Sequence, residues 1–142
     1  MKIKNQKYLF IIYFIIVYTL LNILFLNTIA INLINLWEYI IKHLFGNLFN
    51  YQAFIFVPVC SGVISLSIYL GIIIAGKIAY LKKVKIKSVL YTVLLLWLVN
   101  LLRLIIVLSA EKLSLTLAKI THIVSWFIVG AIILYLALKS FK

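Results

Sequence analysis

Four long apolar runs, separated by short polar and basic segments, limit most strongly how this 142-residue chain can fold. A membrane-spanning helix needs about 20 predominantly apolar residues, because the hydrocarbon core of a bilayer is about 30 Å thick. The chain is 67% hydrophobic and 11% charged, whereas soluble domains average about 45–50% apolar and about 25% charged residues. We therefore predict an all-α, polytopic integral membrane helical bundle that forms a single membrane domain over residues 1–142. The predicted spans cover residues 8–26, 58–80, 88–108 and 122–138.

The segment between the first two runs is amphipathic. Its apolar positions at helical spacing are Ile34, Trp37, Ile41, Leu44 and Leu48. Asparagine, lysine, histidine and glutamate residues lie between them, a pattern that is typical of a helix lying in the membrane interface. We predict an outer interfacial amphipathic helix over about residues 31–48.

The lysines are distributed unequally between the two sides of the predicted bundle. Most of them lie near the N-terminus, in residues 77–87 and at the C-terminus, whereas the other two loops hold both acidic residues. The positive-inside rule then predicts a multi-pass plasma membrane protein with both termini in the cytoplasm. We attribute the net charge of +12 to this pattern and to anionic lipid, and predict no nucleic-acid binding, because the lysines cluster between apolar runs.

The inventory of reactive residues excludes several classes of enzyme. One cysteine forms neither an intramolecular disulfide nor a C-x-x-C redox pair. The single thiol, two histidines and two acidic residues show no spacing typical of metal ligands. We predict no metal and no cofactor.

Three residues that are rare in this chain, Cys60, Arg103 and His122, occur on three successive predicted spans. Each lies about 16–17 residues from a lysine at the cytoplasmic end of its span, or about 24–26 Å along a helix. We therefore predict that they meet near the outer interface and form a site. An arginine within an apolar span costs at least about 2.5–3.5 kcal/mol, which makes it a functional candidate. The alternatives are a buried structural cysteine, a snorkelling arginine and an interfacial histidine.

These residue types predict acyl transfer through a thioester. A thiol is a strong nucleophile as a thiolate, which a nearby cation and a helix N-terminus both favour, and Cys60 follows Pro58 at the predicted helix start. His122 is predicted to take the thiol proton and deliver it to a leaving amine. Arg103 is predicted to hold the carbonyl oxygen as it becomes anionic. Asn100, one turn before Arg103, is predicted to orient Arg103 or the substrate backbone.

At these positions the sequence resembles the archaeosortase/exosortase family of membrane cysteine transpeptidases. The matching elements are Cys60-Ser61-Gly62, Asn100-Leu101-Leu102-Arg103 and His122, in the family's order on successive spans. The resemblance covers about residues 58–130, and many members of the family are longer, with more spans. It implies that Cys60, Arg103 and His122 are catalytic. It also implies supporting, substrate-binding roles for Ser61, Gly62 and Asn100.

The resemblance implies a sortase-like enzyme that acts at the outer membrane face. Its substrates would be exported proteins with a C-terminal sorting signal made of a short motif, an apolar helix and a basic tail. The acyl group would pass to an amine, such as that of a lipid anchor. Two alternatives remain: a simple membrane thiol protease, in which water replaces the amine, and a non-enzymatic accessory subunit of a membrane complex. Small residues four apart, Gly71, Ala75 and Ala79, favour the close helix packing that an accessory subunit needs.

Overall fold

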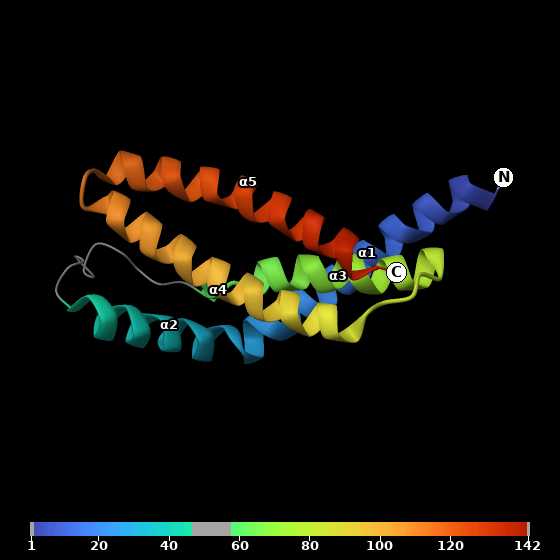
Figure 1. The fold of residues 1–142 in the computed structure, drawn as a ribbon, viewed down its shortest axis with the longest axis horizontal. Coiled ribbons are helices and arrows are strands. Elements are labelled where there is room, and N and C mark those ends of the chain that lie inside the picture. Colours follow the sequence, from blue (N-terminus) through green and yellow to red (C-terminus); the bar gives the residue numbers. More distant parts are fainter. Residues whose placement is uncertain (1, 47–57, 142) are drawn as a thin grey trace.

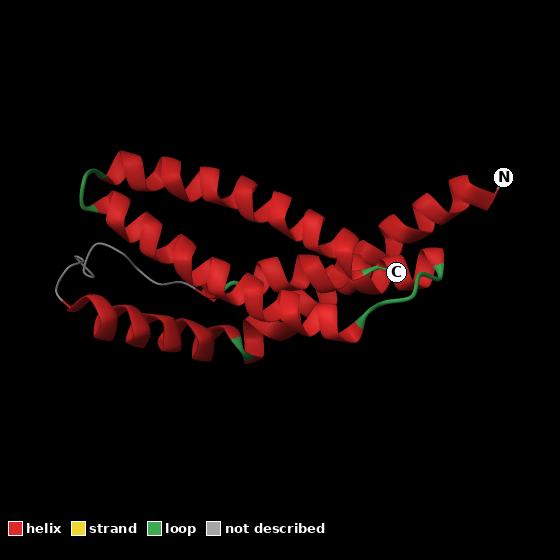
Figure 2. Ribbon diagram, in the orientation of Figure 1, coloured by secondary structure: helices red, strands yellow, loops and turns green. Residues whose placement is uncertain are grey.

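The computed structural model describes the backbone of residues 2–46 and 58–141, and the side chains of residues 5–46 and 60–141. Its elements are α1 (Lys2–Thr28), α2 (Ala30–Phe45), the short 3₁₀ helix η2 (Pro58–Ser61), α3 (Val63–Tyr80), α4 (Ile86–Glu111) and α5 (Leu115–Ser140). All elements of this described part are helical (Figure 2). Asn5–Thr28 within α1 and the whole of α3, α4 and α5 are long and apolar enough to cross a membrane. The chain is therefore an all-α membrane bundle, as predicted.

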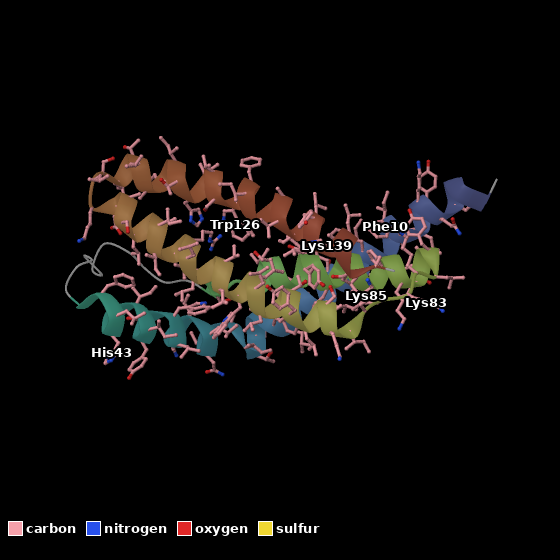
Figure 3. All side chains as sticks on the ribbon, in the orientation of Figure 1. Phe10, His43, Lys83, Lys85, Trp126 and Lys139 are labelled. Carbon is pink, nitrogen blue, oxygen red and sulfur yellow. The ribbon has the colours of Figure 1, made fainter. Side chains whose placement is uncertain are left out.

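The long helices run roughly along one axis of the molecule (Figure 1). Helices α4 and α5 form an antiparallel hairpin, α3 packs against α5, and α1 packs against α3. Helix α2 lies beside the half of the hairpin that contains its turn. We call the end at residues 112–114 the hairpin end, and the opposite end, with loop 81–85, the basic end. Lys83, Lys85 and Lys139 lie toward the basic end (Figure 3).

Helix lengths place Cys60 at a defined level of the bundle. Helix α3 has 18 residues and is about 27 Å long, close to the thickness of a hydrocarbon core. Helices α4 and α5 have 26 residues each and are about 39 Å long. The hairpin therefore extends beyond the start of α3. The η2 helix, which contains Cys60 and precedes α3, lies about one hydrocarbon thickness from the basic end.

Residues 109–121, which lie between the third and fourth predicted spans, are mostly helical, so the predicted ends of these two spans are wrong. Helix α4 continues to Glu111 and α5 begins at Leu115, so only residues 112–114 join them. Ser114 accounts for the early start of α5, because its side-chain oxygen accepts a hydrogen bond from the Leu117 backbone N–H at 3.0 Å and caps the helix. As a consequence, His122 lies two turns inside α5 and not at its first residue.

The predicted start of the second span at Pro58 is also wrong. Pro58 opens η2, and α3 begins only at Val63. Gly62 separates the two helices with φ of 89° and ψ of 0°, a backbone conformation that interrupts a helix and that glycine adopts most readily. Cys60 therefore precedes α3 and does not lie in its first turn.

Helix α2 confirms that this segment forms an amphipathic helix, although its ends differ from those predicted. Its buried residues are Ala30, Ile34, Trp37 and Ile41, a single stripe at spacings of three and four. Gly46, with φ of 51°, ends the helix. Leu44 was predicted on the stripe but is 65% exposed, because Phe45 packs against the buried cluster in its place. Leu48 lies outside the described residues.

The small residues of α3 are used within the chain itself. Gly71, Ala75 and Ala79 are buried, and a Cβ atom at Gly71 would lie 3.2 Å from the ring of Phe14 on α1. Gly71 thus allows α1 to pack closely on α3. The packing of helices within the chain therefore accounts for this row of small residues without a partner subunit.

A buried polar cluster at the basic end ties three helices together and provides a test of the fold. The Ser140 Oγ lies 2.7 Å from the Tyr69 hydroxyl and 3.4 Å from the Ser88 hydroxyl, and Ser140 and Tyr69 are fully buried. Ser140→Ala would leave the Tyr69 hydroxyl without this partner, so we expect it to lower the free energy of unfolding by about 1–3 kcal/mol. Denaturant unfolding in detergent micelles measures the loss. Adding Tyr69→Phe should recover part of it, and a double variant no more stable than Ser140→Ala would contradict this explanation.

Candidate active site

The backbone around Cys60 is held by side chains from two other helices. The Asn100 side-chain amide on α4 donates a hydrogen bond to the Cys60 carbonyl oxygen at 2.9 Å. The Trp37 indole N–H on α2 donates to the Ser61 carbonyl oxygen at 3.2 Å. Within the segment, the Val63 N–H points toward the Ser61 hydroxyl oxygen at 3.4 Å. Because these groups come from separate helices, they fix the position of the cysteine relative to the bundle.

The Cys-Ser-Gly sequence has a steric reason at this position. Gly62 combines a positive φ with a close approach to Asn100, since a Cβ atom at residue 62 would lie 2.9 Å from the Asn100 Cγ. Ser61 beside it is fully buried. Asn100 therefore supports the cysteine-containing turn, whereas the sequence predicted that it orients Arg103 or the substrate.

The Cys60 thiol lies in an apolar environment. Cys60 is a free cysteine with 5% of its surface exposed. It belongs to the buried cluster formed with Trp37, Ile41, Leu104 and Leu108. Solvent therefore has little access to the thiol in this structure.

Arg103 is the most unusual side chain of the site. It is 3% exposed, and none of its three guanidinium nitrogens has a hydrogen-bond partner among the described residues. Its Cζ atom lies 4.3 Å from the centre of the Trp126 ring, a cation–π contact that offsets only part of the cost of burying the charge. Arg103 also interacts electrostatically with both Cys60 and His122. Arg103 therefore lies within electrostatic range of the predicted nucleophile and of the predicted base.

Trp126 is a site residue that the sequence analysis missed. Its indole N–H donates a hydrogen bond to the His122 Nε2 at 3.2 Å, while its ring contacts Arg103. Trp126 lies on the side of α5 that faces the bundle (Figure 3). The sequence signal that could have identified Trp126 was its position four residues after His122, which places both residues on one face of a helix. Trp126 thus orients the candidate base and the candidate cation together.

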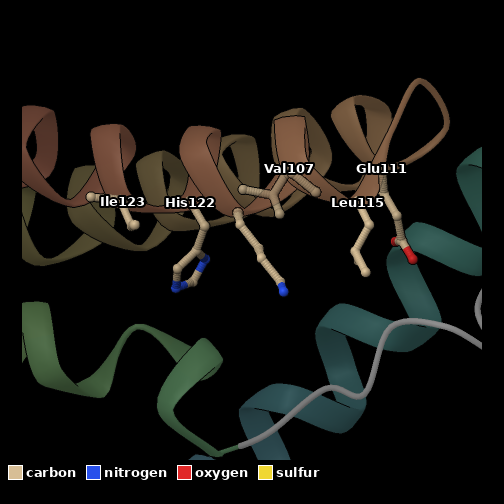
Figure 4. Close-up of a pocket in the computed structure, with 7 residues that line it drawn as sticks. Val107, Glu111, Leu115, His122 and Ile123 are labelled. Atoms are coloured by element: carbon tan, nitrogen blue, oxygen red, sulfur yellow. The ribbon is translucent and has the colours of Figure 1, made fainter.

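A cleft of about 400 Å³ opens beside His122 toward the hairpin end. Glu111 and His122 point into the space between the hairpin and α2 (Figure 4). The lining residues are Val107, Glu111, Leu115, Ala118, Lys119, His122 and Ile123. The cleft is therefore mainly apolar, with one carboxylate and one ammonium group near its hairpin end, and it offers room for a short extended peptide beside the site.

The predicted site residues are partly brought together. Asn100 is hydrogen-bonded to the Cys60 carbonyl and lies against Gly62. Trp126 contacts both Arg103 and His122. In residues 60–141, no hydrogen bond joins the Cys60 thiol directly to His122.

His43 projects from α2 away from the hairpin (Figure 3) and stacks on Tyr39, so it is not part of this site. Within the described ranges 5–46 and 60–141, no three histidine, cysteine, aspartate or glutamate side chains gather as metal ligands would.

The chain matches no known protein-family model, no curated protein and no solved structure. The assignment of a function therefore depends on the residues of the site and on their geometry.

Proposed function

We propose that this protein is a membrane cysteine transpeptidase that resembles the archaeosortases and exosortases. The observation that carries the proposal is Arg103, a buried cation without a hydrogen-bond partner in the described part of the chain, which packs on the Trp126 ring beside His122. An isolated buried charge costs several kcal/mol. The oxygen of a bound carbonyl group, which becomes anionic during acyl transfer, supplies the missing partner.

In the first half of the reaction, the Cys60 sulfur attacks the carbonyl carbon of a peptide bond. His122 takes the thiol proton, and Arg103 donates hydrogen bonds to the oxyanion of the tetrahedral intermediate. When the C–N bond breaks, His122 returns this proton to the leaving amine. The acyl group then remains on Cys60 as a thioester.

In the second half, an acceptor amine attacks the thioester carbonyl carbon. The amine loses a proton through His122 to the departing Cys60 sulfur, and the new amide leaves with the thiol restored. If water attacks in place of the amine, the product carries a free carboxylate and the enzyme is a thiol protease.

The membrane orientation and the substrate follow from charge and from the resemblance. The lysines of the basic end support a cytoplasmic location for that end by the positive-inside rule, and the proposal then has the cleft and the hairpin end outside. The substrate is an exported protein whose C-terminal sorting signal contains an apolar helix, and the acceptor is an amine, such as that of a membrane lipid.

The test is mass spectrometry of exported proteins that end in an apolar helix and a basic tail, each co-expressed with the wild type or with Cys60→Ala. A truncated product with an amine added to its new C-terminus, formed only when Cys60 is present, is the expected result. A Cys60-dependent product with a free carboxylate would identify a protease instead. Products that form equally with Cys60→Ala would overturn the catalytic role of Cys60 and leave the accessory subunit as the better description.

A further inference from the structure

We propose that Trp126 holds the candidate base in a resting state, because the Trp126 indole N–H occupies the nitrogen atom that would accept the Cys60 proton. This inference rests on the proposed function. The indole nitrogen lies 3.2 Å from the His122 Nε2 and donates a hydrogen bond to it. An indole N–H is a donor only, so the Nε2 atom is the acceptor and carries no proton. A neutral imidazole has one N–H, which in this arrangement is at Nδ1.

This arrangement leaves His122 without a free lone pair for the thiol proton. The Nδ1 atom already carries a proton, and the lone pair of Nε2 points at the Trp126 indole. The hydrogen bond between Trp126 and His122 must therefore break before the Cys60 proton moves to Nε2. In that step the S–H bond breaks and its electron pair stays on the sulfur. The imidazole becomes an imidazolium with one proton on each nitrogen.

The same indole also contacts the predicted cation. The Arg103 Cζ lies 4.3 Å from the centre of the Trp126 ring, and no guanidinium nitrogen has a hydrogen-bond partner among the described residues. Trp126 is half-buried and lines a cavity of about 440 Å³ together with Gly130 and Leu134, so the indole has free space beside it. Movement of this one side chain would therefore release His122 and uncover the face of the Arg103 guanidinium in the same step.

Trp126→Phe removes the indole N–H and keeps an aromatic ring beside Arg103. The net worth of a hydrogen bond between neutral groups corresponds to about a two- to tenfold change in an equilibrium constant. In a single turnover of an exported substrate, we therefore expect this variant to form the first cleavage product about two- to tenfold faster than the wild type. The matched control is Trp97→Phe, because the Trp97 indole N–H has no hydrogen-bond partner in the described part of the chain. This control should process the substrate at the wild-type rate.

A spectroscopic measurement tests the hydrogen bond without catalysis. The chain has two histidines, so His43→Gln leaves only His122 in a sample labelled with ¹⁵N-histidine in detergent micelles. At a pH at which the imidazole is neutral, we expect the ¹⁵N spectrum to show the proton on Nδ1 and none on Nε2. Adding Trp126→Phe should give a mixture of the two tautomers, a change that a purely structural role of Trp126 would not produce. The first of these spectra keeps the wild-type tryptophan, so it tests the inference even if the Trp126 variant does not fold.

The outcomes separate this inference from the proposed function. A proton on the His122 Nε2 with Trp126 in place would overturn the inference, and so would a Trp126→Phe variant that processes substrate at or below the wild-type rate. Both results leave Cys60-dependent processing, and hence the proposed function, intact. Absence of any Cys60-dependent product from the wild type would overturn the proposed function and the resting-state role of Trp126 with it, whichever nitrogen carries the proton.

Discussion

Arg103→Met is expected to make the folded protein more stable while slowing substrate processing by about 100- to 1,000-fold. An arginine within an apolar span costs at least about 2.5–3.5 kcal/mol. The contact between Arg103 and the Trp126 ring, at 4.3 Å, offsets only about 0.5–2 kcal/mol of this cost. Because the guanidinium nitrogens have no other partner among the described residues, removing the charge should raise the free energy of unfolding by about 1–2 kcal/mol. Thermal unfolding in detergent micelles and initial processing rates measure the two effects.

Arg103→Lys is the matched control for charge. Lysine keeps the positive charge but lacks the planar fork that stacks on Trp126 and binds an oxyanion with two donors. We expect it to process more slowly than the wild type, without the gain in stability. If Arg103→Met were unstable, the arginine would have a structural role. If it processed substrate at the wild-type rate, Arg103 would not stabilise the oxyanion.

The helices could be predicted from the sequence because hydrophobicity and length act locally. The apolar runs identified all four spans, and the spacing of Ile34, Trp37 and Ile41 identified α2. The ends of α4 and α5 were missed because hydropathy indicates which residues can lie in the membrane. It does not indicate where a helix begins or ends. Both helices continue past the apolar runs, and the capping residue Ser114 marks the true start of α5.

The candidate site was only partly predictable for a different reason. Its rare residues stand out in an apolar sequence, but their supports depend on contacts between distant segments. The hydrogen bond from Asn100 to Cys60 joins positions 40 residues apart, and the bond from Trp37 to Ser61 joins positions 24 apart. No local pattern indicates such contacts. Trp126 is an exception, because its spacing from His122 placed the two on one helix face.

Gly62→Ala is expected to lower the free energy of unfolding by about 2–3 kcal/mol and to slow processing while the thiol is intact. An alanine at φ of 89° is strained, and its Cβ would lie 2.9 Å from the Asn100 Cγ. Asn100 must therefore move, and the Cys60 carbonyl loses the hydrogen bond that positions the nucleophile. Denaturant unfolding in detergent micelles and the processing rate of the same sample report the two effects.

Gly130→Ala is the matched control, and its effect on stability should have the opposite sign. Gly130 lies inside α5 with open space at its Cβ position, so alanine should stabilise the protein by about 0.5–1 kcal/mol. Combining Gly62→Ala with Asn100→Ala separates the two costs, because it removes the clash and leaves the backbone strain. The double variant should lose less stability than the sum of the single changes, by about 1 kcal/mol. Strictly additive losses of stability would show that the Asn100 side chain does not clash with an alanine side chain at position 62. The turn that contains Cys60 would then be positioned by its backbone conformation alone.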